Sequence, residues 1–310
     1  MVDNLSTGRR ENLHPRASFY ELDLRDQALS EVFERERPEV VNHHAAQASV
    51  LQSTADPVAD ADVNLLGSVN LLQRAVEHGV DRVVYISSGG AAYGEPEYLP
   101  VDESHRIAPL SGYGVSKSAV EQYLRVFRHV HGLDYVVLRY PNVYGPRQDP
   151  YGEGGVVAIF TDRMLRGASC TINGDGLQQR DFVFVGDCVK ANELAHAGLG
   201  GSLDGGQNSG LDVGQGGGQS DVPIDGATDG AVYNLGTGEL TSIRELFERL
   251  ADIAGYSLPP VYGPPKPGET YRICLDATLA RDELGWEPAV SLDEGLRLTV
   301  DHFRHRNGVE

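Results

Sequence analysis

The feature that most constrains the fold is an alternation of apolar runs with longer segments of helical period between residues 17 and 140. The apolar runs at 17–24, 39–46, 81–87 and 134–140 predict strands. The segments at 28–35, 60–77 and 110–131 repeat apolar residues at helical spacing, which predicts helices. Strands that alternate with helices indicate a doubly wound parallel sheet, so we expect an α/β fold.

The alternation of predicted strands and helices becomes less regular after residue 145. Further helices are predicted at 156–165, 189–197, 241–255 and 292–304, with strands at 180–185 and 232–235. We expect two domains, a sheet domain at 1–150 and a smaller α/β lobe at 151–310. Segment 200–230 is rich in Gly, Asp, Ser and Gln, which cannot bury enough apolar surface to order a chain. We interpret it as a surface insertion that is dispensable for activity.

Charge and cysteine usage narrow the class of protein. A net charge of −19 and a pI of about 4.9 argue against a nucleic-acid partner, which requires a basic surface. The three cysteines are far apart and odd in number, which favours buried thiols in a reducing compartment. No apolar run approaches the length of a membrane span. These features predict a cytoplasmic protein without a membrane partner.

Tyr113 and Lys117 carry the strongest chemical signal. Four residues apart on a predicted helix, they share one face, a turn apart. A neighbouring ammonium favours phenolate, so we expect a lowered Tyr113 pKa and a proton acceptor near neutral pH. Ser87 and Ser88 end the preceding strand, and one of them is expected to bind the same reacting oxygen. Such a Tyr/Lys pair is also common on exposed helices, so the spacing alone leaves that alternative open.

Several strings occur in the order and spacing of one known family. They are VDNLS at 2–6, NLLG at 64–67, SSGGAAYG at 87–94, the Tyr113/Lys117 pair, LRYPNVYGP at 138–146, QRDFV at 179–183 and LGW at 284–286. The sequence therefore resembles the extended short-chain dehydrogenase/reductases, in particular NAD-dependent nucleotide-sugar epimerases of the UDP-glucose/UDP-galactose type. UDP-glucuronate epimerases or decarboxylases and a truncated non-catalytic paralogue remain alternatives. Gly89 and Gly90 replace the Asp-Glu pair of the related 4,6-dehydratases, which disfavours that reaction.

The resemblance implies a mechanism, a cofactor and partners. Bound NAD takes a hydride from the sugar while Tyr113 takes the hydroxyl proton, and the hydride returns to the other face of a 4-keto sugar. Lys117 is implied to hold the nicotinamide ribose. The family has Ser or Thr where Gly89 stands, so the catalytic hydroxyl is assigned to Ser88, with Ser87 as the alternative. The substrate is implied to be a UDP-sugar and the assembly a homodimer.

The resemblance also implies binding residues at strand ends. For the cofactor they are Asp3, Asn4, Ser6, Asp23, Leu24, His44, Ala45, Ala46, Asn64, Ser87, Tyr113, Lys117, Tyr140 and Val143. For the substrate they are Ser88, Asn142, Arg180, Lys266 and Glu269. Asp3 as a surface residue and Arg180 in a surface salt bridge remain alternatives. Adjacent His43 and His44 point to opposite faces of a strand, so no metal site is expected.

One expected part of the family pattern is not found. The resemblance places residues 2–4 at the end of the second strand, and no GxxGxxG turn for the pyrophosphate occurs in the sequence. In a sheet of order 3-2-1-4-5-6 the first strand is central, so the strands near Val2 and Phe19 are expected to separate from the rest. We therefore expect that the natural protein starts roughly thirty residues earlier and that this chain binds NAD poorly and folds badly.

Overall fold

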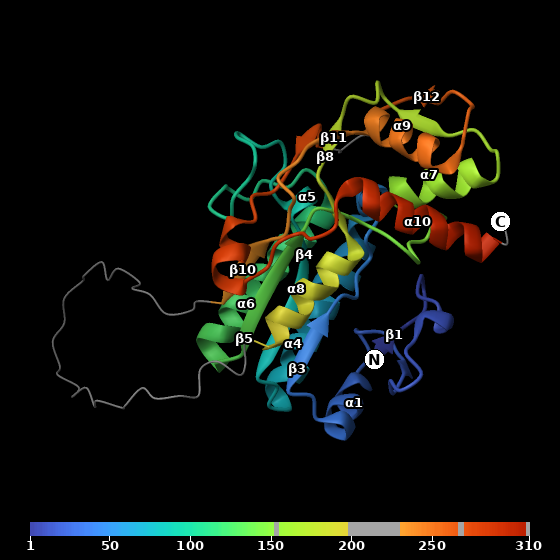
Figure 1. Ribbon diagram of the computed structural model, residues 1–310. Coiled ribbons are helices and arrows are strands. Elements are labelled where there is room, and N and C mark those ends of the chain that lie inside the picture. Colours follow the sequence, from blue (N-terminus) through green and yellow to red (C-terminus); the bar gives the residue numbers. More distant parts are fainter. Residues whose placement is uncertain (152–154, 198–229, 266–269, 308–310) are drawn as a thin grey trace.

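The structure is a computed structural model that describes residues 1–151, 155–197, 230–265 and 270–307 (Figure 1). The predicted insertion at 200–230 lies, except for its last residue, outside the described residues, and so do Lys266 and Glu269. No helix in the described ranges is both long and apolar enough to cross a bilayer.

The main sheet has four parallel strands in the order β10-β5-β4-β3 (Figure 1). They are β3 (Val40–His43), β4 (Arg82–Ser88), β5 (Asp134–Tyr140) and β10 (Ala231–Asn234). The expected doubly wound α/β class is confirmed. Because β10 pairs with β5, a strand from beyond residue 150 completes the sheet. The proposed division into 1–150 and 151–310 stays a prediction.

Alternate residues of the central strands contribute to two hydrophobic cores, one on each face of the sheet. Val83 and Tyr85 of β4 pack with helices α1 (Leu29–Glu36), α4 (Gly67–Glu77) and α6 (Gly112–His131). Val84 and Ile86 pack on the other face with α8 (Val185–Ala197). Both faces are therefore covered, as near-continuous apolar strands require.

Strands β1 (Val2–Asp3) and β2 (Tyr20–Glu21) form a parallel pair in a sheet of their own. The expected separation from the main sheet is thus observed, although Val2 still packs against the core that contains Leu29. The predicted strand at 17–24 is reduced to two residues, since Asp23 accepts the backbone N–H of Arg25 and turns the chain.

The predicted helix at 60–77 has three parts. They are α3 (Pro57–Ala61), a π-helical turn η2 (Asp62–Leu66) and α4. It begins earlier than predicted because the Asp56 side chain accepts Ala59 N–H and a proline occupies the first turn. Two short helices were not predicted, α2 (Val50–Ala55) and α5 (Gly89–Ala92).

The C-terminal lobe packs α7 (Val156–Leu165), α9 (Ile243–Ala254) and α10 (Leu292–Asn307) around a third core (Figure 1). Small sheets surround it: β7 (Thr171–Asn173) with β12 (Val261–Gly263), β8 (Gln179–Arg180) with β11 (Thr241–Ser242) and β13 (Arg272–Ile273), and β6 (Asn142–Tyr144) with β9 (Phe182–Phe184). Two further short turns are η1 (Arg10–Asn12), which is 3₁₀-helical, and η3 (Ala280–Leu284), which is π-helical. The predicted strand at 180–185 is interrupted at Asp181, and α8 begins at Val185.

Candidate active site

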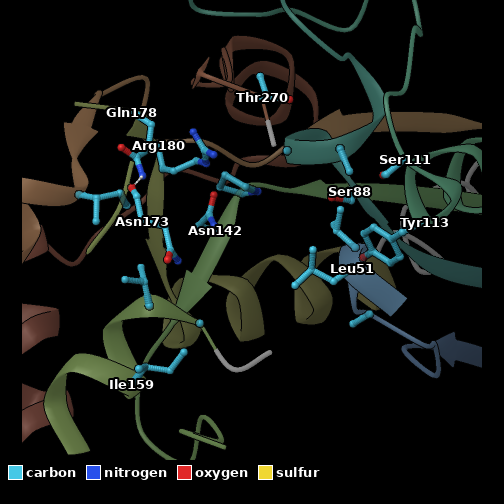
Figure 2. Close-up of a pocket in the computed structure, with 18 of the residues that line it drawn as sticks. Leu51, Ser88, Ser111, Tyr113, Asn142, Ile159, Asn173, Gln178, Arg180 and Thr270 are labelled. Carbon is cyan, nitrogen blue, oxygen red and sulfur yellow. Dashed lines mark hydrogen bonds between the residues drawn. The ribbon is translucent and has the colours of Figure 1, made fainter. Parts of the chain in front are cut away.

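A cavity of about 460 Å³ lies between the carboxyl ends of the sheet and the C-terminal lobe (Figure 2). Ligands of open α/β sheets bind in this crevice. Its labelled lining residues are Leu51, Ser88, Ser111, Tyr113, Asn142, Ile159, Asn173, Gln178, Arg180 and Thr270. Residues from both halves of the chain therefore meet at one site.

The start of α6 places Tyr113 on the cavity wall. The Ser111 side chain caps the helix by accepting Gly114 N–H at 3.2 Å. A Cβ at Gly114 would lie 2.4 Å from the carbonyl oxygen of Ala91, so glycine there lets α6 pack directly against α5. Gly114 thus allows the start of α6, with Tyr113, to approach α5, which follows β4 directly.

Tyr113 and Ser88 face each other in the cavity (Figure 2). Burial raises the pKa of Tyr113 to about 12, and the hydrogen bond with Ser88 opposes this rise. The expected lowering of this pKa is wrong for this structure. The Lys117 nitrogen lies 6.0 Å from the centre of the phenol ring, and loss of hydration disfavours phenolate more strongly.

Lys117 is buried beneath the tyrosine, with 3% of its surface exposed. Its Nζ donates to the Ile86 carbonyl at 2.8 Å and lies 4.9 Å from the centre of the Tyr85 ring. Burial lowers the pKa of Lys117 to about 8, while the carboxylates of Asp60 and Glu121 oppose that shift. The side chain therefore keeps its charge at neutral pH.

The two serines at the end of β4 have different surroundings. Ser88 lines the cavity, whereas Ser87 is 2% exposed and donates to Glu121 at 2.5 Å. Glu121 also pairs with buried Arg139 at 2.5 Å. A Cβ at Gly89 would lie 2.4 Å from the Leu275 side chain, so that position has little room for a serine. The hydroxyl on the cavity wall is that of Ser88.

The loop after β3 is tied down by Asn64. Its side chain accepts Gln47 N–H at 2.7 Å and donates to the Gln47 carbonyl at 2.9 Å. This loop carries the predicted residues His44, Ala45 and Ala46. Asn64, itself predicted to bind the cofactor, therefore fixes the backbone of this loop.

Asn192 of α8 connects two predicted cofactor residues, although sequence reasoning missed it. It donates to the Tyr140 hydroxyl at 2.5 Å, and its Oδ1 lies 3.3 Å from His44 Nε2. Val143, also predicted, packs in the core beside α8. A polar residue midway along a helix gives no sign in the sequence that it meets two strand ends.

The remaining predicted cofactor residues gather at the ends of β1 and β2. Asp3 accepts Leu5 N–H at 2.6 Å, while Asn4 accepts Ser6 N–H at 3.0 Å and donates to Asp23 at 2.9 Å. Arg25 holds the pKa of the Asp23 carboxyl well below its usual range.

Leu24, the last of this set, packs against the first core and offers its backbone oxygen to Asn70. Carboxylates at strand ends suit ribose hydroxyls, and the resemblance assigns Tyr113 and Lys117 to the nicotinamide end. The side chains present therefore fit the two ends of a dinucleotide.

The opposite wall comes from short strands and loops. Arg180 lines the cavity, and its Nη1 donates to the carbonyls of Gln179 and Tyr271 at 2.9 and 3.2 Å. Asn142 lines it as well. Other polar lining residues were not predicted. They are Arg163 on α7, Asn173 at the end of β7, and Gln178 and Thr270 in the segments before β8 and β13. Among the described residues, no cluster of three or more His, Cys, Asp or Glu suits a metal ion.

Comparison with known proteins gives consistent matches. Residues 1–201 match the model of the NAD dependent epimerase/dehydratase family. The UDP-glucose 4-epimerase of Mycolicibacterium smegmatis is 41% identical over 311 residues, covering 99% of this chain and 90% of that protein.

Two solved structures are also similar. UDP-glucose 4-epimerase of Thermotoga maritima with UDP-glucose has a TM-score of 0.86 and 45% identity, with coverage of 99% of this chain and 90% of that one. UDP-glucose 4-epimerase of Thermus thermophilus in complex with NAD has a TM-score of 0.83 and 43% identity, with coverage of 98% and 90%. The similarity thus extends over nearly the whole chain.

Proposed function

Since the chain belongs to the NAD dependent epimerase/dehydratase family, we propose that it inverts C4 of a UDP-sugar, of the UDP-glucose/UDP-galactose type, with NAD as its cofactor. The observation that carries this proposal is the shared cavity. It brings Ser88 and Tyr113, which suit proton transfer, together with Arg180, which suits a diphosphate. Relatives named UDP-glucose 4-epimerase, with UDP-glucose or NAD bound, support it.

The proposed reaction uses Tyr113 as the base that removes the proton of the C4 hydroxyl while the C4–H bond breaks. Ser88 donates a hydrogen bond to the same oxygen, which becomes the carbonyl of a 4-keto sugar. When bound, NAD would supply the acceptor and donor of the hydride at C4. The sugar turns within the cavity between the two transfers, and Tyr113 gives its proton back.

Lys117 supports the base electrostatically in this proposal. Because burial raises the pKa of Tyr113 to about 12, the phenol needs nearby positive charge to act at neutral pH. The Lys117 ammonium, one turn along the same helix, supplies such a charge. Its bond to the Ile86 carbonyl uses one of three N–H donors, which leaves the others to hold a ribose hydroxyl.

Substrate recognition is assigned to Asn142 and Arg180, with Lys266 and Glu269 as further contacts that lie outside the described residues. The cavity also contains Asn173, Gln178 and Thr270, whose neutral polar groups suit the hydroxyls of a ribose or hexose. The adenosine end of NAD is assigned to Asp3 and Asp23 and the residues gathered around them.

A homodimer is supported by an apolar surface on α6 and the adjoining α3 and η2. It consists of Val58, Leu66, Val115, Tyr123, Val126 and Val130, which we call the α6 stripe. These side chains are 42–77% exposed, and α3 and η2 pack beside α6. A second copy that presents the same stripe would bury these side chains in a self-complementary helical interface.

A cytoplasmic location is supported by the cysteines. Cys170, Cys188 and Cys274 are all free and buried. Unpaired buried thiols are typical of reducing compartments.

The proposal is tested by incubating the purified protein with UDP-galactose and NAD and separating the products by chromatography. We expect UDP-glucose to accumulate to an equilibrium that is also reached from UDP-glucose. Tyr113→Phe removes one hydroxyl and is expected to lower kcat by roughly 10²–10⁴-fold with an unchanged melting temperature. Folded, NAD-bound protein that converts neither sugar would overturn the proposal, and a fully active Tyr113→Phe variant would overturn the role of the tyrosine.

A further inference from the structure

Asp60, on α3, is a buried carboxylate with no role in the reaction described above. It is 1% exposed. Its Oδ2 accepts from the Ser116 hydroxyl at 2.6 Å, and its Oδ1 accepts from Gln47 at 2.8 Å and Asn64 at 3.0 Å. Three donors from three different segments therefore converge on one side chain.

The donors belong to the two parts of the site that must be held together. Ser116 lies on α6 between Tyr113 and Lys117, in the same helical turn. Gln47 lies in the loop after β3, and its side chain also donates to the Ser49 carbonyl at 3.0 Å. Ser49 caps α2, and the segment around it contributes Ala48, Val50 and Leu51 to the cavity wall. Asp60 thus connects the catalytic turn of α6 to the neighbouring wall.

The charge of Asp60 is as important as its hydrogen bonds. Buried Lys117 has no carboxylate within ion-pair distance among the described residues, and the two acids that favour its charge are Asp60 and Glu121. Glu121 is already neutralised by Arg139, at 2.5 Å. Within the same described ranges, no Lys, Arg or His nitrogen forms an ion pair with Asp60. The uncompensated negative charge near Lys117 is therefore that of Asp60.

We propose that Asp60 is a positioning residue of the epimerase: it holds the Tyr113–Lys117 turn of α6 against the loop after β3 and keeps Lys117 charged during turnover. The inference rests on the proposed function. Its two parts are separable, because Ser116 carries the connection to α6 whereas the carboxylate carries the charge.

The surroundings of Lys117 determine the expected pH dependence. In the described part of the chain, six titratable side chains face Lys117: Asp60 on α3, Tyr113 and Glu121 on α6, Tyr85 on β4, His43 at the end of β3, and His44 directly after it. Arg139 acts on Lys117 indirectly, through its ion pair with Glu121. Burial lowers the pKa of His43 to about 3, so it is neutral in the working range. Removing the Asp60 charge disfavours the ammonium, so Lys117 would lose its proton at lower pH.

The first experiment measures the protonation of Lys117 directly, without any enzyme assay. The sequence has three lysines, Lys117, Lys190 and Lys266, so protein labelled with ¹⁵N at lysine Nζ gives few signals to assign. Lys190→Arg and Lys266→Arg identify the other two. We expect a wild-type midpoint near 8 for Lys117 and a decrease of about one pH unit or more in Asp60→Asn. A wild-type midpoint below neutral pH would overturn the proposal without any Asp60 variant.

The second experiment follows kcat against pH for the wild-type, Asp60→Asn and Ser116→Ala proteins. An asparagine can still bond Ser116 and Gln47, so Asp60→Asn is expected to shift the alkaline limb of the profile toward lower pH. Ser116→Ala keeps the charge and is expected to lower kcat by up to roughly tenfold with the limb unmoved. Glu77→Gln removes an exposed carboxylate on α4 and serves as the control for net charge.

The outcomes distinguish failure of the proposed function from failure of the proposed role of Asp60. An inactive, folded wild-type protein counts against the proposed function, while the lysine titration still tests Asp60. An active enzyme whose lysine midpoint and alkaline limb do not respond to Asp60→Asn refutes the charge role. If Ser116→Ala moves the limb as far as Asp60→Asn does, the two parts are not separable and the proposal is wrong.

Discussion

The two walls of the cavity are built in different ways. We assign proton transfer to the wall of Ser88, Ser111 and Tyr113. It rests on Asp60, Ser87 and Lys117, each at most 3% exposed: Asp60 and Ser87 bond other buried side chains, and Lys117 bonds the Ile86 carbonyl. The recognition wall, to which we assign substrate binding, consists of Asn142, Asn173, Gln178, Arg180 and Thr270. These residues lie in or within two residues of strands that are two or three residues long, and Gln178 and Arg180 bond backbone carbonyls, as Gln178 does to Asn173 at 2.8 Å.

We expect this difference to separate the effects of substitutions on rate from their effects on affinity. A fully satisfied buried network fixes the positions of its members, which general acid–base chemistry requires. A wall of surface strands holds its groups less rigidly, and it can bind a large polar ligand through many contacts. Changes on the first wall should therefore reduce kcat, and changes on the second should raise KM.

The largest effect within this comparison is expected at Ser88. Ser88→Ala removes the hydroxyl that faces Tyr113 and should lower kcat by roughly 10²-fold with little change in KM. Ser87→Ala removes a buried bond to Glu121 and should lower stability by about 1.5–3 kcal/mol while kcat is largely kept. Steady-state kinetics and urea unfolding of both variants check this. A larger loss of kcat in Ser87→Ala would show that the assigned hydroxyl is wrong by one residue.

A smaller effect, on affinity, is expected at Arg180. Arg180→Ala removes a charged donor from the recognition wall and should raise KM for the UDP-sugar by about 10–100-fold, with kcat within a few-fold. Arg272→Ala, on the adjoining strand β13 and exposed, is the matched control and should leave both constants unchanged. If Ser88→Ala and Arg180→Ala lowered kcat equally, the assignment of proton transfer to one wall and substrate binding to the other would be contradicted.

The smallest effect on catalysis is expected outside both walls. Val126→Asp places a charge in the α6 stripe and should convert a dimer to a monomer, measured by light scattering, with kcat within about twofold. Val189→Asp is the control, since Val189 is 54% exposed against 53% for Val126 but lies on α8. A monomeric wild-type protein, or dimers in both variants, would refute the assignment of the interface.

The sequence predicted the parts of the fold that are long and periodic. β4, β5, α1 and α6 agree with prediction within about two residues, because continuous apolar runs mark the buried strands and the 3.6-residue period persists along the helices. β6, β7 and β12 were missed, since three residues carry no period. Asn173, the recognition residue on β7, was missed with its strand, whereas Asn142 on β6 had been named from the resemblance.

The sequence predicted the site residues that belong to a recognisable motif. It missed the residues whose contacts depend on how distant segments pack. Tyr113 and Ser88 were named from a spacing and a resemblance, and the structure places both in the cavity. Asp60 and Asn192 look like ordinary polar residues on helices, and only the packing of distant segments brings donors to them. The prediction of a lowered Tyr113 pKa was wrong for a related reason. The sequence shows the neighbouring charge of the lysine but not the burial of the phenol, which raises the pKa.

The burial of Lys117 also gives the folding equilibrium a pH dependence. Its pKa is about 8 in the folded protein against 10.5 as the ordinary value, so between these limits the unfolded chain holds a proton that the folded chain has lost. Stability from this group therefore rises with pH across that window, by about 3 kcal/mol in total, and below it the full desolvation penalty is present. Lys117→Met should abolish turnover yet unfold at higher urea near pH 7, and the difference between the two proteins should shrink at pH 9–10. The buried lysine that catalysis requires would then lower the stability of the folded protein. A chain no longer selected for activity could regain that stability with a single substitution.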